Sequence, residues 1–471
     1  MGPGFRRDDE EGVGNRKIRG PPMSSQPREQ WSSRLAFLLS TIGSAVGLAN
    51  IWRFPYTVGT GGGAVFLLTF LLSVAALALP LLIAELMVGR RYRVSPPNAI
   101  RAAAVEAGAS PRWRFLGLAG VAAAILVLSF YSVVGGWVMA YILDPAADSA
   151  GIAQARFDGL VGDPVRLFAW SSLFLWATVA ISMRGITGGV ELANKVMTPI
   201  LFLLLLAMAG YAMLVGDVAA AARFLFTPDF SKVTPDVLLD AFGQAFFALG
   251  VGATNLMAYG SYMDRGEKVI RSSVIIVGSA VFVSLLSGFA VFPVLFAMGL
   301  DPAGGPALTF VTLPYMFAHM PGGSVVGVAF FVLLFAAAIT SAISMMEAPV
   351  SFLTERLGWK RAHAALLSGG LSWGLCLLSV LSFNIWSDVK PLAWAGLLTD
   401  KTFFGLFDYL TSNIVLPGGG CLIAVLVGWK ISRAVQSGEL GEGLAFRAWR
   451  FCIRWLAPLA LAVIFAAKVV E

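Results

Sequence analysis

The sequence predicts an all-α polytopic membrane protein with about 11 transmembrane helices. Hydrophobic residues make up 58% of the 471 residues, only 13% are charged and the mean hydropathy is +0.79, which is unusual for a water-soluble protein of this length. Apolar runs long enough to cross a bilayer recur along the whole chain. Glycines interrupt two of these runs in their middle, which predicts a 5+5 inverted repeat with broken helices one and six.

The first interrupted run is expected at 34–57. Gly43 and Gly47 weaken its middle, and Asn50, Arg53 and Pro55 follow at once. In a bilayer, unpaired backbone groups are tolerated only where they are buried in protein or line a cavity. We therefore expect a helix that breaks at mid-membrane and presents bare peptide groups to a polar ligand.

The second interrupted run, at 243–262, repeats this pattern, with Gly250 and Gly252 followed by Thr254 and Asn255. Two broken helices about five spans apart are typical of an inverted-repeat secondary transporter, in which the breaks meet at mid-membrane and form the binding site. A hairpin at 306–321 is expected to cap the outer side. The other spans are expected at 64–88, 115–143, 167–183, 190–215, 269–298, 325–353, 364–383, 404–429 and in a last segment ending near residue 470.

The loop after the second span carries the strongest topology signal. Its cations place it in the cytoplasm by the positive-inside rule, so the amino terminus is expected inside and the carboxy terminus outside, in the inner or plasma membrane. The same rule accounts for the net charge of +7 without a nucleic-acid partner. The arginines of this loop are Arg90, Arg91, Arg93, Arg101, Arg112 and Arg114.

Three domains are expected along the chain. Residues 1–27 form a disordered cytoplasmic tail, 28–434 form the transporter core of helices one to ten, and 435–471 form a cytoplasmic loop and helix eleven. The three cysteines lack pair spacing, only two histidines are present, and no nucleophile–base set is visible, so neither a metal centre of those ligands nor an enzyme is expected.

The chain resembles the neurotransmitter:sodium symporter family over residues 28–429, and its bacterial amino-acid transporters in particular. The run Gly43-Ser-Ala-Val-Gly-Leu-Ala-Asn-Ile-Trp-Arg-Phe-Pro-Tyr56 carries the resemblance, with support from the Tyr259-Gly-Ser-Tyr motif and the Thr340-Ser341 pair. The resemblance implies that a substrate carboxylate binds at the helix breaks and that its transport is coupled to sodium. Half-helix amino ends suit a carboxylate, and free carbonyls suit a hard cation.

The resemblance implies one complete sodium site. Its ligands would be the carbonyls of Gly43, Val46 and Ala337 and the hydroxyls of Thr340 and Ser341. The alternative is that these two hydroxyls only pack or bond to the carbonyl one turn earlier in the helix, as serine and threonine often do.

The family's other ion sites look degraded in this chain. Ala45 and Asn50 match the second sodium site, but Ala248 and Ala280 replace two of its side-chain ligands, so the site is expected to be empty or weak, or to use a substitute. The chloride site has lost its phenol at Phe70 and its hydroxyl at Ala248, and no chloride dependence is expected.

The resemblance also implies a substrate pocket in which Tyr131 donates its hydroxyl to the substrate carboxylate; the alternative is simple aromatic packing. Gly47 stands where the monoamine branch has an aspartate, which favours an amino acid. Gly250, Ala253, Thr254 and Asn255 depart from the residues that the resemblance implies at these positions. They indicate a roomier or more polar pocket, so a small aliphatic substrate is not assured. The pocket residues are Ala45, Gly47, Leu48, Ala49, Val127, Tyr131, Phe247, Ala248, Gly250, Ala253, Ser341 and Met345.

Two gates follow from the same resemblance. Arg53 and Asp408 would pair on the outer side. Arg28 and Glu355 would pair on the inner side beside Trp31, unless they are unrelated interfacial charges.

Two carboxylates within the spans need partners. Glu85 is interpreted as structural because it lies near a helix end, where water is close. Glu347 is either a structural anchor or part of an inner ion exit.

The leading hypothesis is a sodium-coupled symporter of an amino acid or a similar carboxylate, working by alternating access. The alternatives are transport that is proton-coupled or uncoupled, which the degraded second site motivates, and a non-transporting sensor. The expected partners are a small-molecule substrate, sodium and the lipid bilayer. The sequence leaves the exact substrate and the oligomeric state open.

Overall fold

The computed structural model describes residues 29–303 and 308–470, and within these ranges it contains helices and connecting segments but no β-strand. In the described ranges, nine helical segments are long and apolar enough to cross a membrane, and the bent pair Arg34–Ala45 with Ala49–Thr60 supplies a tenth span. The remaining expected span, helix six, is split into two shorter helices. The predicted amino-terminal tail, 1–27, lies outside the described residues.

The first half of the chain contains α1 (Arg34–Ala45), α2 (Phe54–Thr60), α3 (Ala64–Ser73), α4 (Leu79–Tyr92), α5 (Pro96–Glu106), α6 (Arg114–Leu143), α7 (Ala150–Gly162), α8 (Pro164–Met183), α9 (Leu192–Val215) and α10 (Val218–Phe226). The second half contains α11 (Pro235–Leu249), α12 (Asn255–Gly260), α13 (Val269–Ala297), α14 (Leu313–Ala318), α15 (Gly323–Leu357), α16 (Arg361–Leu381), α17 (Phe403–Tyr409), α18 (Leu416–Val425), α19 (Arg433–Leu440), α20 (Leu444–Phe451) and α21 (Ala457–Val470). Short π-helical turns lie at Ala49–Arg53, Val74–Ala78, Ile186–Glu191, Leu308–Thr312, Leu410–Val415, Leu426–Lys430 and Cys452–Leu456, and 3-10 turns at Pro111–Trp113, Phe230–Lys232 and Ala393–Ala395.

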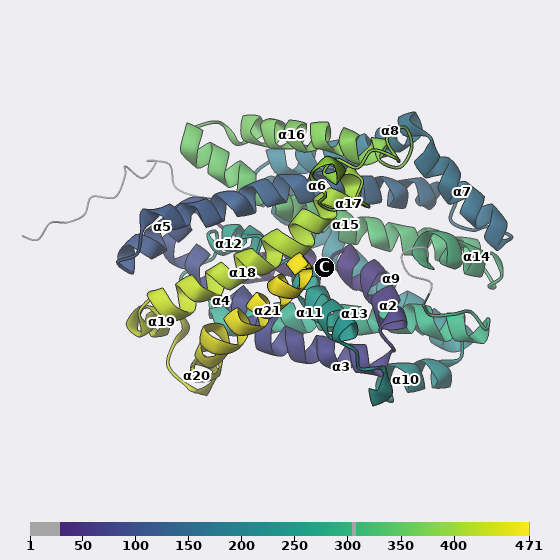
Figure 1. The fold of residues 1–471 in the computed structure, drawn as a ribbon, viewed down its shortest axis with the longest axis horizontal. Coiled ribbons are helices and arrows are strands. Elements are labelled where there is room, and N and C mark those ends of the chain that lie inside the picture. The colour runs from purple at the N-terminus through teal and green to yellow at the C-terminus, as the bar shows by residue number, and fades with distance from the viewer. Residues whose placement is uncertain (1–28, 304–307, 471) are drawn as a thin grey trace, which may run out of the picture.

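The long helices lie side by side along the molecule, with α6 and α15 packed against each other at its centre (Figure 1). Helices α5, α19 and α20 gather at one end of this bundle, and α7, α10 and α14 gather at the other. We call the first the inner end, following the orientation that the basic loop predicts, and the second the outer end.

The predicted break in helix one is present. Helix α1 begins after Ser33, whose hydroxyl accepts a hydrogen bond from the Ala36 N–H at 3.1 Å, and it ends at Ala45. The chain then bends by 50° before the segment Ala49–Thr60. Pro55 lies in the first turn of α2 and has no N–H, and the Asn50 carbonyl of the preceding π-helical turn accepts from the Ser287 hydroxyl at 2.8 Å.

The predicted break in helix six is present as well, between α11 and α12. Gly250 and Gly252 adopt φ values of 61° and 93°, which glycine tolerates. Thr254 adopts φ 63° although it is β-branched, an uncommon and strained conformation. The helix begins at Pro235, eight residues before the predicted start, because Thr234 caps it by accepting from the Val237 N–H.

Several predicted loops contain helices of their own. The basic loop contains α5, the loop after the third span contains α7, and α10 follows the fifth span. The outer hairpin predicted at 306–321 includes α14 and the preceding π-helical turn, while residues 304–307 lie outside the described part. These helices are shorter than a membrane span, so a search for long apolar runs does not find them.

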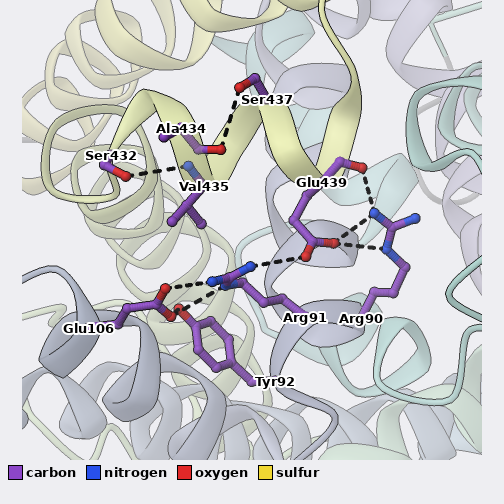
Figure 2. A network of polar contacts seen from close by, with 9 residues as sticks. All are labelled: Arg90, Arg91, Tyr92, Glu106, Ser432, Ala434, Val435, Ser437 and Glu439. Atoms are coloured by element: carbon purple, nitrogen blue, oxygen red, sulfur yellow. Dashed lines mark hydrogen bonds and ion pairs between the residues drawn. The ribbon is translucent and has the colours of Figure 1, made fainter. Parts of the chain in front are cut away.

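A cluster of ion pairs ties three elements together at the inner end (Figure 2). Glu439 of α19 accepts from Arg90 at 2.7 Å and from Arg91 at 3.1 Å, both at the end of α4. Arg91 also pairs with Glu106 of α5 at 2.5 Å, and this guanidinium holds the pKa of the Glu106 carboxyl below its usual value. Helix α19 is thereby fastened to the membrane core.

Helices α4 and α12 approach each other closely at Gly89. A Cβ at this position would collide with the Met257 carbonyl oxygen and lie 3.0 Å from the Ser261 nitrogen. We expect Gly89→Val to force these helices apart and to lower stability by about 1–3 kcal/mol or more, as overpacking does. Thermal unfolding of the purified protein in detergent measures this. The control is Gly278→Val, on the exposed face of α13 with no atom within 4 Å of its Cβ position; equal melting temperatures for the two variants would contradict the packing argument.

Candidate functional site

The break in helix one meets α6 and α15 at Gly47 and Leu48. The Leu48 N–H, freed by the break, donates to the Tyr131 hydroxyl of α6 at 3.5 Å. A Cβ on Gly47 would lie 2.5 Å from Ser341 Oγ of α15 and 3.5 Å from Tyr131 Oη. A peptide N–H without a partner in its own helix, a phenol and a hydroxyl thus converge on one point, which is a suitable set of donors for a carboxylate.

The other residues of the predicted pocket lie on these elements and around the second break. Val127 lies one turn before Tyr131 on α6, and Met345 lies one turn after Ser341 on α15. The residues that flank the two breaks are Ala45 and Ala49 at the first, and Phe247, Ala248, Gly250 and Ala253 at the second.

The oxygens predicted to bind sodium come from α1 and α15, which are in contact. A Cβ on Gly43 would lie 3.3 Å from Thr340 Cβ, and the Ser341 hydroxyl donates to the Ser44 carbonyl at 3.4 Å. Thr340 donates to the Ala336 and Ala337 carbonyls at 3.0 and 3.1 Å, so back-bonding does occur, but the lone pairs of its oxygen remain available. In the described ranges no group of three or more His, Cys, Asp and Glu could hold a metal ion.

The degraded second sodium site contains a side-chain amide in hydrogen bonds. Asn50 Nδ2 donates to the Ala45 carbonyl at 3.4 Å and to the Ala280 carbonyl at 3.3 Å. The Asn50 amide therefore donates to the Ala45 carbonyl, which belongs to the predicted second sodium site. Three buried oxygens nearby, Asn50 Oδ1, Gln244 Oε1 and Ser284 Oγ, have no hydrogen-bond partner among the described residues.

The second break is held by Glu85 of α4. Its Oε1 accepts from the freed Gly252 N–H at 2.7 Å, and its side chain is fully buried. The expectation that Glu85 lies near water at a helix end is therefore wrong. The sequence marked Glu85 as a carboxylate inside a span but held no signal for its partner, which is 167 residues away.

The outer side of the first break opens into a cavity of about 230 Å³. The Arg53 guanidinium lines it and lies 4.5 Å from the centre of the Phe247 ring. Within the described ranges, Arg53 and Asp408 form no ion pair, and Asp408 instead accepts from Ser412 at 3.0 Å. The predicted outer gate pair is not formed in this conformation.

The inner side is closed around Trp31. Its indole N–H donates to the Tyr259 carbonyl at 3.2 Å, and its ring packs edge-on against Tyr259 and Tyr262. Arg28, the predicted partner of Glu355, lies outside the described residues. Glu355 accepts from the Ser95 N–H at 2.6 Å and thereby contacts the start of α5.

Glu347, the second carboxylate within the spans, is paired with Arg361. Arg361, at the start of α16, pairs with it through both terminal nitrogens, and Tyr262 donates to it at 2.6 Å. The Glu347 side chain is fully buried and that of Arg361 is 16% exposed. The group anchors α12, α15 and α16 to one another at the inner side.

Comparison with known proteins extends over nearly the whole chain. The sequence profile of the Sodium:neurotransmitter symporter family matches residues 28–149 and 164–471. The chain belongs to this family. It is 37% identical to YhdH, an uncharacterized sodium-dependent transporter of Bacillus subtilis, with 94% of this chain and 98% of that protein covered. An uncharacterized sodium-dependent transporter of Haemophilus influenzae is 31% identical, with 94% and 99% covered.

A solved structure shares the fold. The crystal structure of MhsT in complex with L-phenylalanine superposes with a TM-score of 0.85 at 36% identity, and the match covers 94% of this chain and all of MhsT. The predicted family and the predicted fold class, an all-α polytopic membrane protein with an inverted repeat, are confirmed. The protein is an integral multi-pass transporter of a sodium-dependent family and not an enzyme.

The Glu347–Arg361 pair yields a test of what stabilises the inner side. We expect Glu347→Gln and Arg361→Met each to lower the free energy of unfolding by about 3–5 kcal/mol, because each leaves an unpaired charge in a buried site. The double variant should recover most of this loss. Thermal melts of all four proteins form a double-mutant cycle, and additive losses would show that the pair is not coupled.

Proposed function

We propose that this protein is a sodium-coupled symporter of an amino acid that works by alternating access and uses one intact sodium site. The observation that carries the proposal is the convergence of Leu48 N–H, Tyr131 and Ser341 on Gly47. A substrate carboxylate placed there would accept from the peptide N–H and the phenol. Gly47 leaves no side-chain charge to pair with an amine-only ligand.

The sodium ion would bind one turn away, between α1 and α15. Its ligands would be the carbonyls of Gly43, Val46 and Ala337 and the hydroxyls of Thr340 and Ser341. The contacts of Gly43 with Thr340 and of Ser44 with Ser341 support this arrangement. Sodium bound there would hold the two helices together and would favour whichever conformation it binds more tightly.

The substrate is proposed to be an amino acid with a sizeable side chain. Ala248, Gly250 and Ala253 around the second break are all small, and among the described residues no atom lies within 4 Å of the Cβ position of Gly250. The phenylalanine in the MhsT complex supports an aromatic candidate.

The conformation described here fits an outward-facing state of such a cycle. The inner side is held together by Trp31 and the Glu347–Arg361 pair, while Arg53 lines a cavity on the other side of the break. Approach of Arg53 to Asp408 would close the outer gate, and separation of Arg28 from Glu355 would open the inner one. In this proposal the amino terminus faces the cytoplasm and the carboxy terminus the outside of the inner or plasma membrane.

The hydrogen bonds of Asn50 favour transport that is coupled to one sodium ion and not to two. Its amide already bonds the Ala45 carbonyl, and Ala248 and Ala280 offer no side-chain ligands. The same observation favours the second candidate function, a transporter of this fold that is proton-coupled or uncoupled.

Ligand-dependent stabilisation separates these two candidates. We expect one or more amino acids, aromatic ones first, to raise the melting temperature in Na⁺ but not in K⁺ or choline. The double variant Thr340→Ala/Ser341→Ala should lose the sodium dependence, because it removes both hydroxyl ligands. Equal stabilisation in all three salts would reject sodium coupling and favour the second candidate.

Sodium stoichiometry is a separate test. We expect substrate uptake into proteoliposomes to rise with sodium concentration with a Hill coefficient of about one, because a single site is intact. Replacing chloride by gluconate should leave the uptake rate unchanged. A Hill coefficient near two would mean that the Asn50 site binds an ion despite its missing ligands.

A further inference from the structure

Asn194 on α9 points an unpaired oxygen at helix one. Its side chain is fully buried, and Nδ2 donates to the Val190 carbonyl at 2.8 Å. This hydrogen bond needs the NH₂ group, so it fixes which way the amide faces. The other atom, Oδ1, is buried and has no donor among the described residues.

The target of this oxygen is Gly43. Asn194 Oδ1 is the atom nearest to the Cβ that Gly43 lacks, followed by Thr198 Oγ1 at 2.7 Å and Thr340 Cβ at 3.3 Å. The Thr198 hydroxyl donates to the Leu39 carbonyl at 3.2 Å, so it does not donate to the Asn194 oxygen. Helices α1, α9 and α15 therefore meet at this glycine, and the amide oxygen of Asn194 is left there without a donor.

A buried acceptor without a donor costs free energy, so it calls for a reason. Water and a weak contact with the Gly43 Cα–H group are two ways of meeting the cost, and a cation is a third. An amide oxygen is a normal ligand for a hard cation, and this one adjoins Gly43 and Thr340, both assigned above to sodium.

Toward the inner end, a carboxylate that is already paired precedes Asn194. Glu191 precedes it on the same helix, its side chain is only 2% exposed, and it accepts from both the backbone N–H and the hydroxyl of Ser32. Lys195 pairs with Glu191 at 2.6 Å. This carboxylate therefore has its cationic partner, and it leaves the Asn194 oxygen as the buried acceptor without a donor among the described residues.

We propose that Asn194 is a sodium-binding side chain, whose Oδ1 coordinates the ion on the inner side of the site formed by Gly43 and Thr340. This inference rests on the sodium site proposed above. It adds a ligand from α9 to a site otherwise made by α1 and α15, so that sodium binding links three helices. It also accounts for Gly43, since any side chain there would displace the amide.

The test is sodium-dependent stabilisation of the purified full-length protein, measured as melting temperature against NaCl at constant ionic strength with choline chloride. We expect Asn194→Ala to raise the half-saturating sodium concentration roughly tenfold, the effect of losing one charge–dipole contact. Asn194→Asp, which keeps the shape and adds charge, should lower that concentration. The control is Ser171→Ala on α8, which removes an equally buried hydroxyl that donates to the Leu167 carbonyl of its own helix at 2.8 Å and should leave the midpoint unchanged.

The outcomes distinguish this proposal from the one on which it rests. If both Asn194 variants keep the wild-type midpoint while Thr340→Ala/Ser341→Ala abolishes the sodium effect, the site stands and Asn194 only packs against Gly43. If sodium does not stabilise the wild-type protein at all, the sodium site fails and this inference fails with it. If Asn194→Ala does not fold, the isosteric aspartate variant decides, and a midpoint equal to wild type overturns the proposal.

Discussion

The rest of this structure depends on one constraint: inside a bilayer, where no water is present, every peptide group needs a hydrogen-bond partner within the protein. Helix one and helix six both stop at mid-membrane, and each break frees peptide groups that lipid cannot satisfy. The Leu48 N–H is met by Tyr131, and the Gly252 N–H is met by Glu85. The two breaks are therefore stable only inside a bundle that supplies these side chains from other helices.

The same constraint explains why several groups inside this bundle lower its stability. Glu85 is a buried carboxylate, Thr254 holds a left-handed backbone conformation, and Asn194 keeps an unpaired oxygen. Each of these features costs free energy, and together they lie at or beside the breaks. Strained and unpaired groups of this kind are typical of sites that bind a ligand or change conformation. Their position agrees with that of the proposed substrate and sodium sites.

The two ends of the bundle differ in how they are held. At the inner end, Trp31, Glu347 with Arg361, and Glu439 with two arginines join elements that are far apart in the sequence. At the outer side of the first break, Arg53 lies over Phe247 beside a cavity and does not reach Asp408 within the described structure. This asymmetry is what alternating access requires of one of its end states.

The sequence by itself determined the spans, the two breaks and the residue types around them. Apolar length, glycine and proline act locally, so 34–57 and 243–262 could be recognised without knowing their neighbours. The short helices α5, α7 and α10 were not predicted because they are too short to give an apolar run of membrane length. The tertiary structure alone decided the partners of Glu85, Glu347 and Asn194, because which helices meet depends on the packing of the whole bundle and leaves no periodic signal in the chain.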